Sequence, residues 1–210
     1  MNIFQRLKQQ RKHGLLAQSF LTRLEKLGLY LNIYTVYVEH LRDENPQFPD
    51  NKYRLEEIRE DNMAEISKNF ADPMRIWTAT WRRRLAEGES GFALRHGDDV
   101  AGFSWAASSV CPSPIGKVLF KLDDGEAYLH DMVIAMKYRG AGLAPLLRFA
   151  CYKELLRRNY SVAYSTSKYF NKPANRFKEK LDAKRRETRG EIMLFKKYRF
   201  DVLLKSHRSE

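Results

Sequence analysis

Hydrophobic and polar residues along the chain recur with two periods, that of a strand and that of a helix. Apolar, aromatic and β-branched residues dominate Tyr30–Leu41 in alternation, which predicts a strand. A second strand is predicted over 53–60. Between the two, 42–51 holds two prolines and mostly polar residues, so we expect a linker. Asn62, with Glu65 three residues later, resembles a capping box and predicts the start of a helix.

The pattern then predicts a second helix and a series of strands. Pro73 is expected to open a helix on which Trp77, Trp81 and Leu85 share one face, and Gly88 is expected to end it. Further along, we expect a hairpin over 91–108 that turns near 97–98, and then a loop over 111–116. Two strands over 117–122 and 127–134 should follow, joined by the turn 123–126. The rest of the chain predicts a helix that ends at Arg158, a strand over 160–167, a helix from about Pro173, and two strands within 190–205. Strands alternate with helices without an internal repeat, which predicts an α/β (α+β) domain on one mixed sheet.

Length and composition fit one globular domain with an extension. The chain has 210 residues, 43% of them hydrophobic, which suits a single domain of ordinary size. We expect an N-terminal extension over 1–50 and the main domain over 51–210. No apolar run reaches the roughly 20 residues that cross a bilayer. The first residues also lack the apolar core of a signal peptide, so a cytoplasmic location is expected.

The two cysteines of the chain, Cys111 and Cys151, show no CxxC or Cys/His spacing. Such a pair predicts neither a disulfide framework nor a zinc site. We therefore expect two reduced thiols and no metal.

Positive charge gathers at the two ends of the chain. The formal net charge is +12, to which 1–27 contribute +5 (six Lys or Arg and one Glu) and 171–210 contribute +7 (thirteen and six). The middle, 28–170, carries nineteen residues of each sign. Nucleic-acid enzymes more often carry a basic stripe across the working face, so no nucleic-acid partner is expected. The basic ends fit attraction to an anionic ligand or surface, or simple solvation.

The first 27 residues form a basic amphipathic segment. Its apolar residues recur at helical spacing, with Lys and Arg between them: Ile3, Phe4, Leu7, Leu16, Phe20, Leu24 and Leu27. Such a segment either packs against the domain or makes weak contact with an anionic membrane surface, and both interpretations stay open.

The most informative stretch is KYRGAGLAPLL, where a predicted strand gives way to a helix that begins near Gly142–Leu143. The first turn of a helix presents free N–H groups and the positive end of the helix dipole, which favours an anion. Gly140 and Gly142 let main-chain amides approach a phosphate, and Arg139 adds planar donors. Pro145 falls in the first turn, where its missing N–H is harmless. The alternative is a glycine turn with no ligand.

The helix that follows this junction is amphipathic. Its apolar stripe is predicted to face the sheet and to consist of Leu143, Leu146, Leu147, Ala150, Cys151 and Leu155. Its basic residues, Arg148, Lys153, Arg157 and Arg158, are expected to face away. Packing of the stripe would fix the N-terminus of the helix in place.

Two common phosphate-binding motifs do not fit the junction. A dinucleotide-binding loop needs a third small residue where this chain has Pro145, and an acidic residue about 20 positions later, which is missing. A Walker loop needs G-x-x-x-x-G-K-[ST], which is absent from the sequence.

The junction resembles the GNAT acyltransferases. Arg139-Gly140-Ala141-Gly142-Leu143-Ala144 matches their R/Q-x-x-G-x-G/A motif. A later segment, 171–183, is similar to their N-x-x-A-x-R-F-Y-E-K-L-G-F pattern, with Asn171, Ala174, Arg176, Phe177, Glu179, Lys180 and Leu181 in place. The order of predicted elements from Tyr53 to Lys205 also looks like that family.

The resemblance implies a fold and a co-substrate. The fold is a mixed, mostly antiparallel sheet that splays open between its fourth and fifth strands, is flanked by helices, and receives acetyl-CoA or another acyl-CoA in the opening. The main chain of Val133 and Ile134 would bond the pantetheine arm, and Asn171 would contact that arm from the other side. The pyrophosphate would be bound by the main-chain amides of Arg139, Gly140, Ala141, Gly142, Leu143 and Ala144.

Transfer of an acetyl group to an amine needs a base, because an ammonium ion with a pKa near 10 is not a nucleophile. Asp131 is our candidate, since similar enzymes often place a carboxylate at the end of that strand; a carboxylate satisfied by a neighbouring cation is the alternative. Glu126 and His130 are the next candidates. His130 should point away from Asp131 unless a bulge intervenes.

The proton donor for the departing thiolate is less clearly indicated. Many members of the family carry a tyrosine where this chain has Lys178, and an exposed helix-surface lysine is the alternative interpretation. The usual Gly-Phe after that helix is here Asp182-Ala183. Tyr164 and Tyr198 are further candidates for the donor, as is water.

The sequence leaves two functions open. The first is an N-acetyltransferase that acts on a small primary amine, including an anionic one such as a nucleotide-linked amino sugar bound by the basic C-terminal section. The second is a non-catalytic acyl-CoA-binding or docking module that kept the fold. Trp77, Trp81, 82–84 and Trp105 are candidates for the acceptor site or for the core, and a homodimer is compatible with either function.

Overall fold

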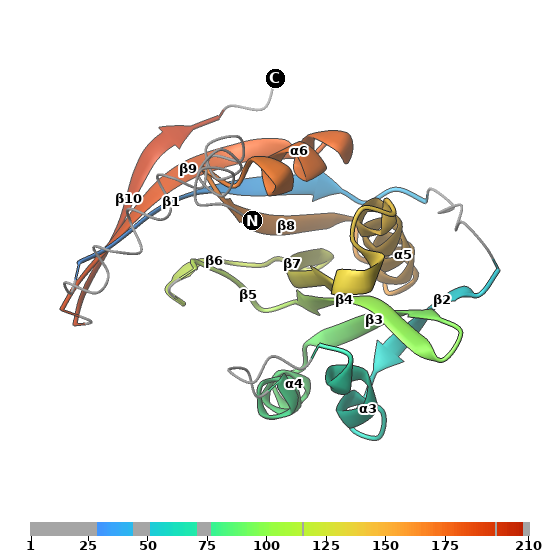
Figure 1. Cartoon of the computed structure of the whole chain (residues 1–210). Helices are drawn as coiled ribbons and strands as arrows, with labels where there is room; N and C mark the ends of the chain where they lie inside the picture. The colour runs from blue at the N-terminus through green and yellow to red at the C-terminus, as the bar shows by residue number, and fades with distance from the viewer. Residues whose placement is uncertain (1–28, 44–50, 71–76, 115, 196, 208–210) are drawn as a thin grey trace, which may run out of the picture. The chain divides into compact units, whose positions relative to one another are not determined.

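The computed structural model describes residues 29–43, 51–70, 77–114, 116–195 and 197–207 (Figure 1). The amphipathic segment 1–27, most of the predicted linker and the predicted helix start at Pro73 lie outside these residues and stay predictions. The chain divides into two compact units. We call 40–112 with 118–164 the larger unit, and 29–39, 113–117 and 165–207 the smaller unit.

The larger unit is built on a sheet in the order β8-β7-β4-β3-β2. Its strands are β2 (Tyr53–Ile58), β3 (Ser90–His96), β4 (Asp99–Ala107), β7 (Glu126–Ile134) and the first part of β8 (Val162–Lys168). All neighbours are antiparallel except β7 and β8, which pair in parallel from Glu126↔Val162 to Tyr128↔Tyr164. A separate hairpin joins β5 (Val110–Pro112) and β6 (Val118–Lys121), where a loop was expected before a single strand.

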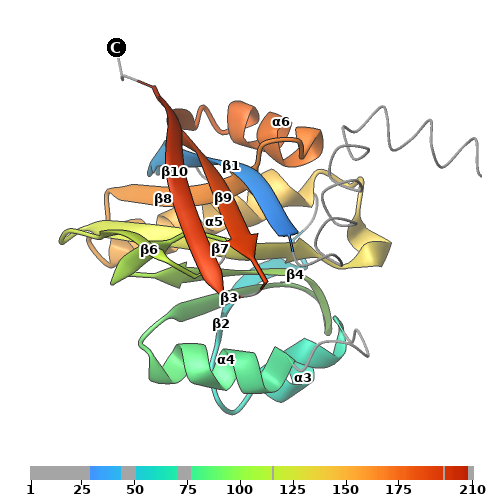
Figure 2. The same ribbon diagram turned by 90° about the vertical axis from the view of Figure 1, so that its left-hand side faces the viewer.

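Helices cover both faces of this sheet (Figures 1 and 2). They are α3 (Met63–Lys68) and α4 (Trp77–Ala86) on one face and α5 (Leu143–Arg157) on the other, with the short 3-10 helix η1 (Met136–Tyr138) before α5. The alternation of β3 decides which residues enter which core. Phe92 and Leu94 pack with α5, whereas Ala93 between them packs with α3 and α4.

The smaller unit is a second set of strands in the order β10-β9-β1-β8. It contains β1 (Leu29–His40), the last part of β8, α6 (Lys172–Lys180), β9 (Lys184–Leu194) and β10 (Tyr198–Ser206). β9 begins six residues before the 190 expected from its apolar pattern. Pairing with β1 from Lys184 and with β10 from Glu187 holds the charged stretch 184–189 extended.

One sheet face of the smaller unit is polar and buried. Asn32 Nδ2 donates to Glu191 Oε2 at 3.0 Å, and the Tyr34 hydroxyl donates to Asp201 Oδ2 at 2.7 Å. Burial, followed by the hydrogen bond to Asp201, raises the pKa of the Tyr34 hydroxyl. The opposite face carries cross-strand rows of apolar side chains, Leu29–Leu194–Tyr198 and Leu31–Ile192–Phe200.

Two local predictions were wrong because a tertiary contact replaced a local one. The expected capping box at Asn62 does not form: its side chain accepts no hydrogen bond from the amides of α3. Instead, Glu65 makes a two-pronged ion pair with Arg95, at 2.7 and 2.8 Å. Arg148 was expected to face away from the sheet, yet it is only 3% exposed. It shares a helix face with Tyr152 four residues later, which is also buried, so α5 buries two adjoining faces.

Candidate functional site

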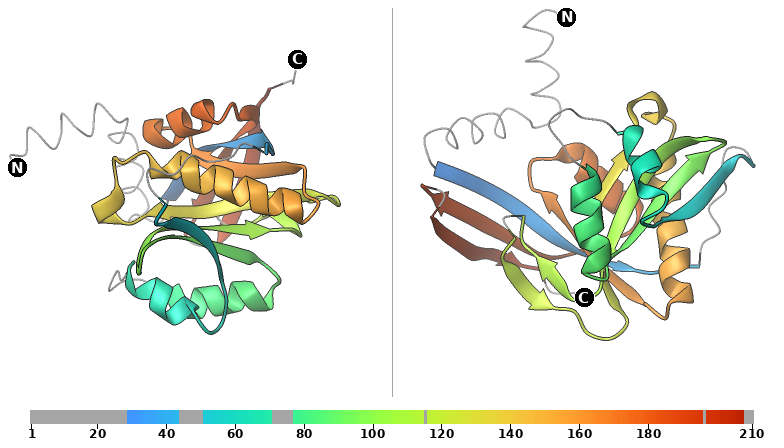
Figure 3. Two further views of the ribbon diagram at one scale, coloured as in Figure 1. Left: turned by 90° about the vertical axis from the view of Figure 1, so that its right-hand side faces the viewer. Right: turned by 90° about the horizontal axis from the view of Figure 1, so that it is seen from below.

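The junction between β7 and α5 forms an open turn in the larger unit (Figure 3). Gly140 and Gly142 have φ angles of 87° and 74°, in the left-handed region that favours glycine. Within the described residues, no atom comes within 4 Å of a Cβ built on either glycine. Gly142 is the N-cap of α5 and has no side chain to bond the first-turn amides. These amides therefore remain available to an anion.

Contacts on both sides fix the position of this turn. Leu143 and Leu147 anchor the first turns of α5 in the core, and each is fully buried. On the strand side, Arg139 Nε donates to the Ile134 carbonyl at 3.2 Å. Lys137 lies 2.7 Å from Asp99, and its hydrogen bond lowers the pKa of the Asp99 carboxyl. The turn is thus rigidly placed, with two cations beside it.

The end of β7 lies unusually close to β4. Gly102 pairs with Ile134, and a Cβ on Gly102 would lie 2.8 Å from the Val133 carbonyl oxygen and 2.7 Å from the Ile134 side chain. Glycine is therefore required at this position, because any side chain would displace the β7 main chain. This contact fixes Val133 and Ile134, the residues expected to bond the pantetheine arm.

A bulge turns the middle of β7. Trp105 pairs with His130 and Phe103 with Val133, so Ser104 alone lies opposite two residues, Asp131 and Met132. Asp131 takes a φ of 44°, which is uncommon for a residue with a side chain. The bulge removes the alternation expected for His130 and Asp131. Both reach the end of α4 and the residues just after it.

Four charged or titratable side chains meet there. Arg84 Nη2 donates to Asp131 Oδ2 at 2.5 Å, and Arg84 Nε lies 3.7 Å from Glu89 Oε2. His130 Nε2 is 3.0 Å from the same Glu89 oxygen. The alternative weighed for Asp131, a carboxylate satisfied by a cation, is what the structure shows. Glu89 was not predicted, because His130 follows it 41 residues later in the chain and only the fold brings the two together.

The tryptophans weighed for the acceptor site belong to the core. Trp81 and Trp105 are completely buried, with ring centroids 5.7 Å apart, and Phe103 packs against Trp81 at 4.9 Å. The neighbouring arginines hold carboxylates: Arg82 lies 2.7 Å from Glu60. The two buried tryptophans therefore build the core on the α4 side of the larger unit.

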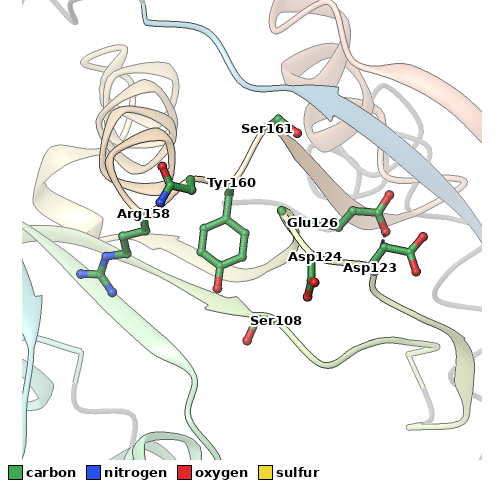
Figure 4. Close-up of a pocket in the computed structure, with 9 residues that line it drawn as sticks. Ser108, Asp123, Asp124, Glu126, Arg158, Tyr160 and Ser161 are labelled. Atoms are coloured by element: carbon green, nitrogen blue, oxygen red, sulfur yellow. Dashed lines mark hydrogen bonds between the residues drawn. The ribbon is translucent and has the colours of Figure 1, made fainter.

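Glu126 and Tyr164 form a pair at the start of β7 and β8. The Tyr164 hydroxyl donates to Glu126 Oε1 at 2.7 Å. Glu126 also lines a cavity of about 520 Å³, together with Ser108, Asp123, Asp124, Gly125, Arg158, Asn159, Tyr160 and Ser161 (Figure 4). This cavity lies at the C-terminal end of α5, about 22 Å of helix from the glycine turn. It is therefore distinct from the glycine turn at the N-terminus of α5.

The two predicted residues of the smaller unit both make intramolecular contacts. Asn171 Oδ1 caps α6 by accepting from the Ala174 amide at 3.3 Å. Lys178 is buried, and its Nζ donates to Glu39 Oε1 at 2.6 Å, with side chains 5% and 0% exposed. The alternative interpretation, an exposed lysine on the helix surface, therefore does not hold, and the catalytic role stays a prediction. At the end of α6, Asp182 adopts a φ of 53°, so it takes the left-handed conformation that glycine usually supplies.

Two further observations bound the chemistry of the described residues. Within them, no three His, Cys, Asp or Glu side chains are grouped so that they could hold a metal ion. No helix among them has both the length and the apolar character needed to cross a membrane.

Solved structures share this fold at low sequence identity. A conserved protein of unknown function from Staphylococcus epidermidis ATCC 12228 matches with a TM-score of 0.55 and 8% identity, over 83% of this chain and 66% of its own. A GCN5-related N-acetyltransferase from Kribbella flavida matches with a TM-score of 0.52 and 10% identity, over 81% of this chain and 62% of its own. A GCN5-related N-acetyltransferase from Sphaerobacter thermophilus matches with a TM-score of 0.51 and 14% identity, over 89% of this chain and 57% of its own. The chain thus spans less than two thirds of each, and the likeness shows an α/β GNAT-like fold.

The family follows from the sequence match. The model of the acetyltransferase (GNAT) family matches residues 52–183, more than half of the chain. The chain therefore belongs to the GNAT acetyltransferase family, and the predicted mixed, mostly antiparallel sheet flanked by helices is confirmed. No curated protein sequence matches the chain.

Proposed function

We propose that this protein transfers an acetyl group from acetyl-CoA to a primary amine of a small molecule. Family membership supports acetyl transfer. The observation that carries the proposal is the glycine turn before α5, where the first-turn amides lack a side-chain cap and the glycines face open space.

The residues present fit a coenzyme A pyrophosphate. The amides from Arg139 to Ala144 would bind its oxygens, with the positive end of the α5 dipole behind them. The main chain of Val133 and Ile134 would bond the pantetheine arm, although Arg139 already holds the Ile134 carbonyl. Asn171 belongs to the smaller unit, where its side-chain oxygen caps α6, and its role toward the cofactor stays a prediction from the sequence. When bound, the thioester supplies an activated acetyl carbon.

The acceptor must reach that carbon as a neutral amine, and the carbonyl oxygen must be stabilised as charge develops on it. We assign the stabilising donor to a main-chain N–H near Val133, whose position Gly102 fixes. Direct attack by the amine then needs only that both reactants be held next to each other.

Thiol release tests this function directly. The full-length protein is incubated with acetyl-CoA and a panel of polyamines, aminoglycosides, amino sugars and nucleotide-linked amino sugars, and both free thiol and acetylated amine are measured. We expect both products with at least one amine. Gly142→Ala should weaken acetyl-CoA binding by roughly tenfold, since its Cβ would meet the phosphate oxygens.

Gly97→Ala is the matched control. Gly97 also has a positive φ, 60°, and open space around it, but it lies in the turn between β3 and β4. It should carry a similar backbone strain and leave acetyl-CoA affinity unchanged. Equal affinity losses in the two variants would contradict the site.

One observation favours the second function, a non-catalytic acyl-CoA-binding module. Lys178, at the place of the usual tyrosine, is held in a buried ion pair with Glu39. In that case acetyl-CoA would bind with the expected sensitivity to Gly142→Ala, but no amine in the panel would release thiol.

A further inference from the structure

The charged cluster at the β7 bulge contains an arrangement that the carboxylate prediction did not include. His130 and Glu89 approach at 3.0 Å, and their side chains are 15% and 17% exposed. Arg84, 11% exposed, lies between Glu89 and Asp131. These contacts all lie within the larger unit, on the strand that carries Val133 and Ile134.

Arg84 forms an ion pair with Asp131, the carboxylate that was expected to act as the base. Its guanidinium reaches Asp131 at 2.5 Å and also lies over the Trp105 ring, 5.3 Å from the centroid. The arginine is therefore held by a buried aromatic ring on one side and by the carboxylate on the other. A substrate ammonium would have to displace this contact before it could reach Asp131.

His130 is oriented for proton transfer by three neighbours. A carboxylate can only accept a hydrogen bond, so a neutral His130 bonded to Glu89 carries its hydrogen on Nε2 and keeps the lone pair on Nδ1. Arg84 holds Glu89 in turn. The imidazole also stacks on Tyr128, with centroids 5.4 Å apart and planes inclined by 12°. Among the described residues, Glu89 and Tyr128 thus contact the ring, and Arg84 and Asp131 complete the charged cluster beside it.

We propose that His130, held by Glu89, is the general base of the transferase reaction, and that Arg84 is a positioning residue which fixes Glu89 and occupies Asp131. The inference rests on the proposed function. His130 precedes Val133 by three residues, about 10 Å along the strand, which places it near the reacting end of a pantetheine arm bound to Val133 and Ile134.

The proton balance is simple. Nδ1 of His130 takes one proton from the acceptor ammonium and later returns it to solvent. The neutral amine forms the new N–C bond while the C–S bond of the thioester breaks. The second proton of the nitrogen ends on the coenzyme A sulfur, so the products are the amide, the free thiol and one proton released to solvent.

The test compares pH–rate profiles for the fastest amine of the panel. His130→Gln keeps a hydrogen-bond donor for Glu89 but cannot take up the proton. It should lower kcat by about 100-fold or more and remove the acidic limb of the kcat/KM profile, with acetyl-CoA affinity unchanged. Glu89→Gln should lower kcat by about tenfold with little change in KM. His40→Gln, at the exposed end of β1, is the matched control and should keep the wild-type profile.

Two outcomes would overturn the inference alone. One is an active wild type whose acidic limb survives in His130→Gln but disappears in Asp131→Asn. The other is independent of activity: long-range ¹H–¹⁵N spectra of the imidazole should show the hydrogen on Nε2, and a hydrogen on Nδ1 would contradict the geometry. A wild type that binds acetyl-CoA but releases no thiol would overturn the proposed function and this inference together. Thermal melting of each variant separates these results from misfolding.

Discussion

The two units of the molecule use polar residues in opposite ways. In the larger unit, the candidate groups retain contact with solvent: Asp131 is 45% exposed and the glycine turn is open. In the smaller unit, several polar groups are buried and bound to each other, as in Lys178 with Glu39 and Asn32 with Glu191. Both units carry motif residues of the same family.

The difference follows from the cost of burying charge. A buried charge without a partner is strongly destabilising, so Lys178 and Glu39 must stay together in the folded state. A partly exposed group can exchange its partner for a substrate at small cost. We therefore place the base in the larger unit and expect these buried pairs of the smaller unit to contribute to stability.

Breaking the buried ion pair should give the largest effect. Lys178→Met leaves Glu39 buried and uncompensated, so we expect the free energy of unfolding to fall by about 3–5 kcal/mol, measured by urea denaturation. The double variant Lys178→Met/Glu39→Leu should recover most of that loss. A stable Lys178→Met protein that binds acetyl-CoA but has lost transfer would show instead that Lys178 is the proton donor.

A smaller effect is expected at the Arg95 cluster of the larger unit. Burial alone would raise the pKa of Glu56, but hydrogen bonds from Arg95 and Asn62 outweigh it and lower the pKa; hydrogen bonds from Arg95 lower that of Glu65. Carboxyls with a lowered folded-state pKa stabilise the fold above the unfolded value of about 4.3. That contribution is lost as the pH falls through the folded-state values.

Arg95→Gln should therefore cost about 2–3 kcal/mol at pH 7 and much less at pH 3. Urea denaturation of the wild type and the variant between pH 3 and pH 7 measures the difference in their free energies of unfolding. Because Glu65 is 57% exposed, most of the effect should come from Glu56. A pH-independent difference between the two proteins would contradict the linkage.

The close approach of β4 to β7 gives the next prediction. Gly102→Ala forces the Val133 carbonyl to move, so we expect a loss of about 1–3 kcal/mol in stability, together with weaker acetyl-CoA binding by calorimetry. Gly190→Ala is its counterpart in the smaller unit. The three described atoms nearest to the new Cβ all belong to the Leu204 side chain, the first at 3.3 Å, and acetyl-CoA affinity should stay the same.

The smallest effect should come from Tyr164→Phe. It removes one hydrogen bond to Glu126, worth about 1 kcal/mol of unfolding free energy. The Glu126 carboxylate keeps the Asp123 amide as a donor, so the fold should survive. If transfer activity falls far more than stability, Tyr164 acts in catalysis, as the sequence prediction holds.

Most elements of the fold could be predicted, because their signals are local. The hairpin turn at Gly97, the end of α4 near Gly88 and the start of α5 after Gly142 each depend on a few adjacent residues. The wrong predictions involved partners distant in the chain. Glu65 forms an ion pair with Arg95, 30 residues later, instead of a capping box with Asn62. Arg148 is buried because a second face of α5 is packed.

The sequence by itself determined the glycine turn and the helix behind it, because left-handed backbone, an uncapped first turn and an apolar stripe are properties of neighbouring residues. Only the tertiary structure decided the partners of the titratable side chains. The β7 bulge turned Asp131 toward Arg84 and His130 toward Glu89, and burial paired Lys178 with Glu39. The electrostatic environment of a side chain depends on groups that the fold brings near it, and the spacing of residues along the chain does not predict which groups these are.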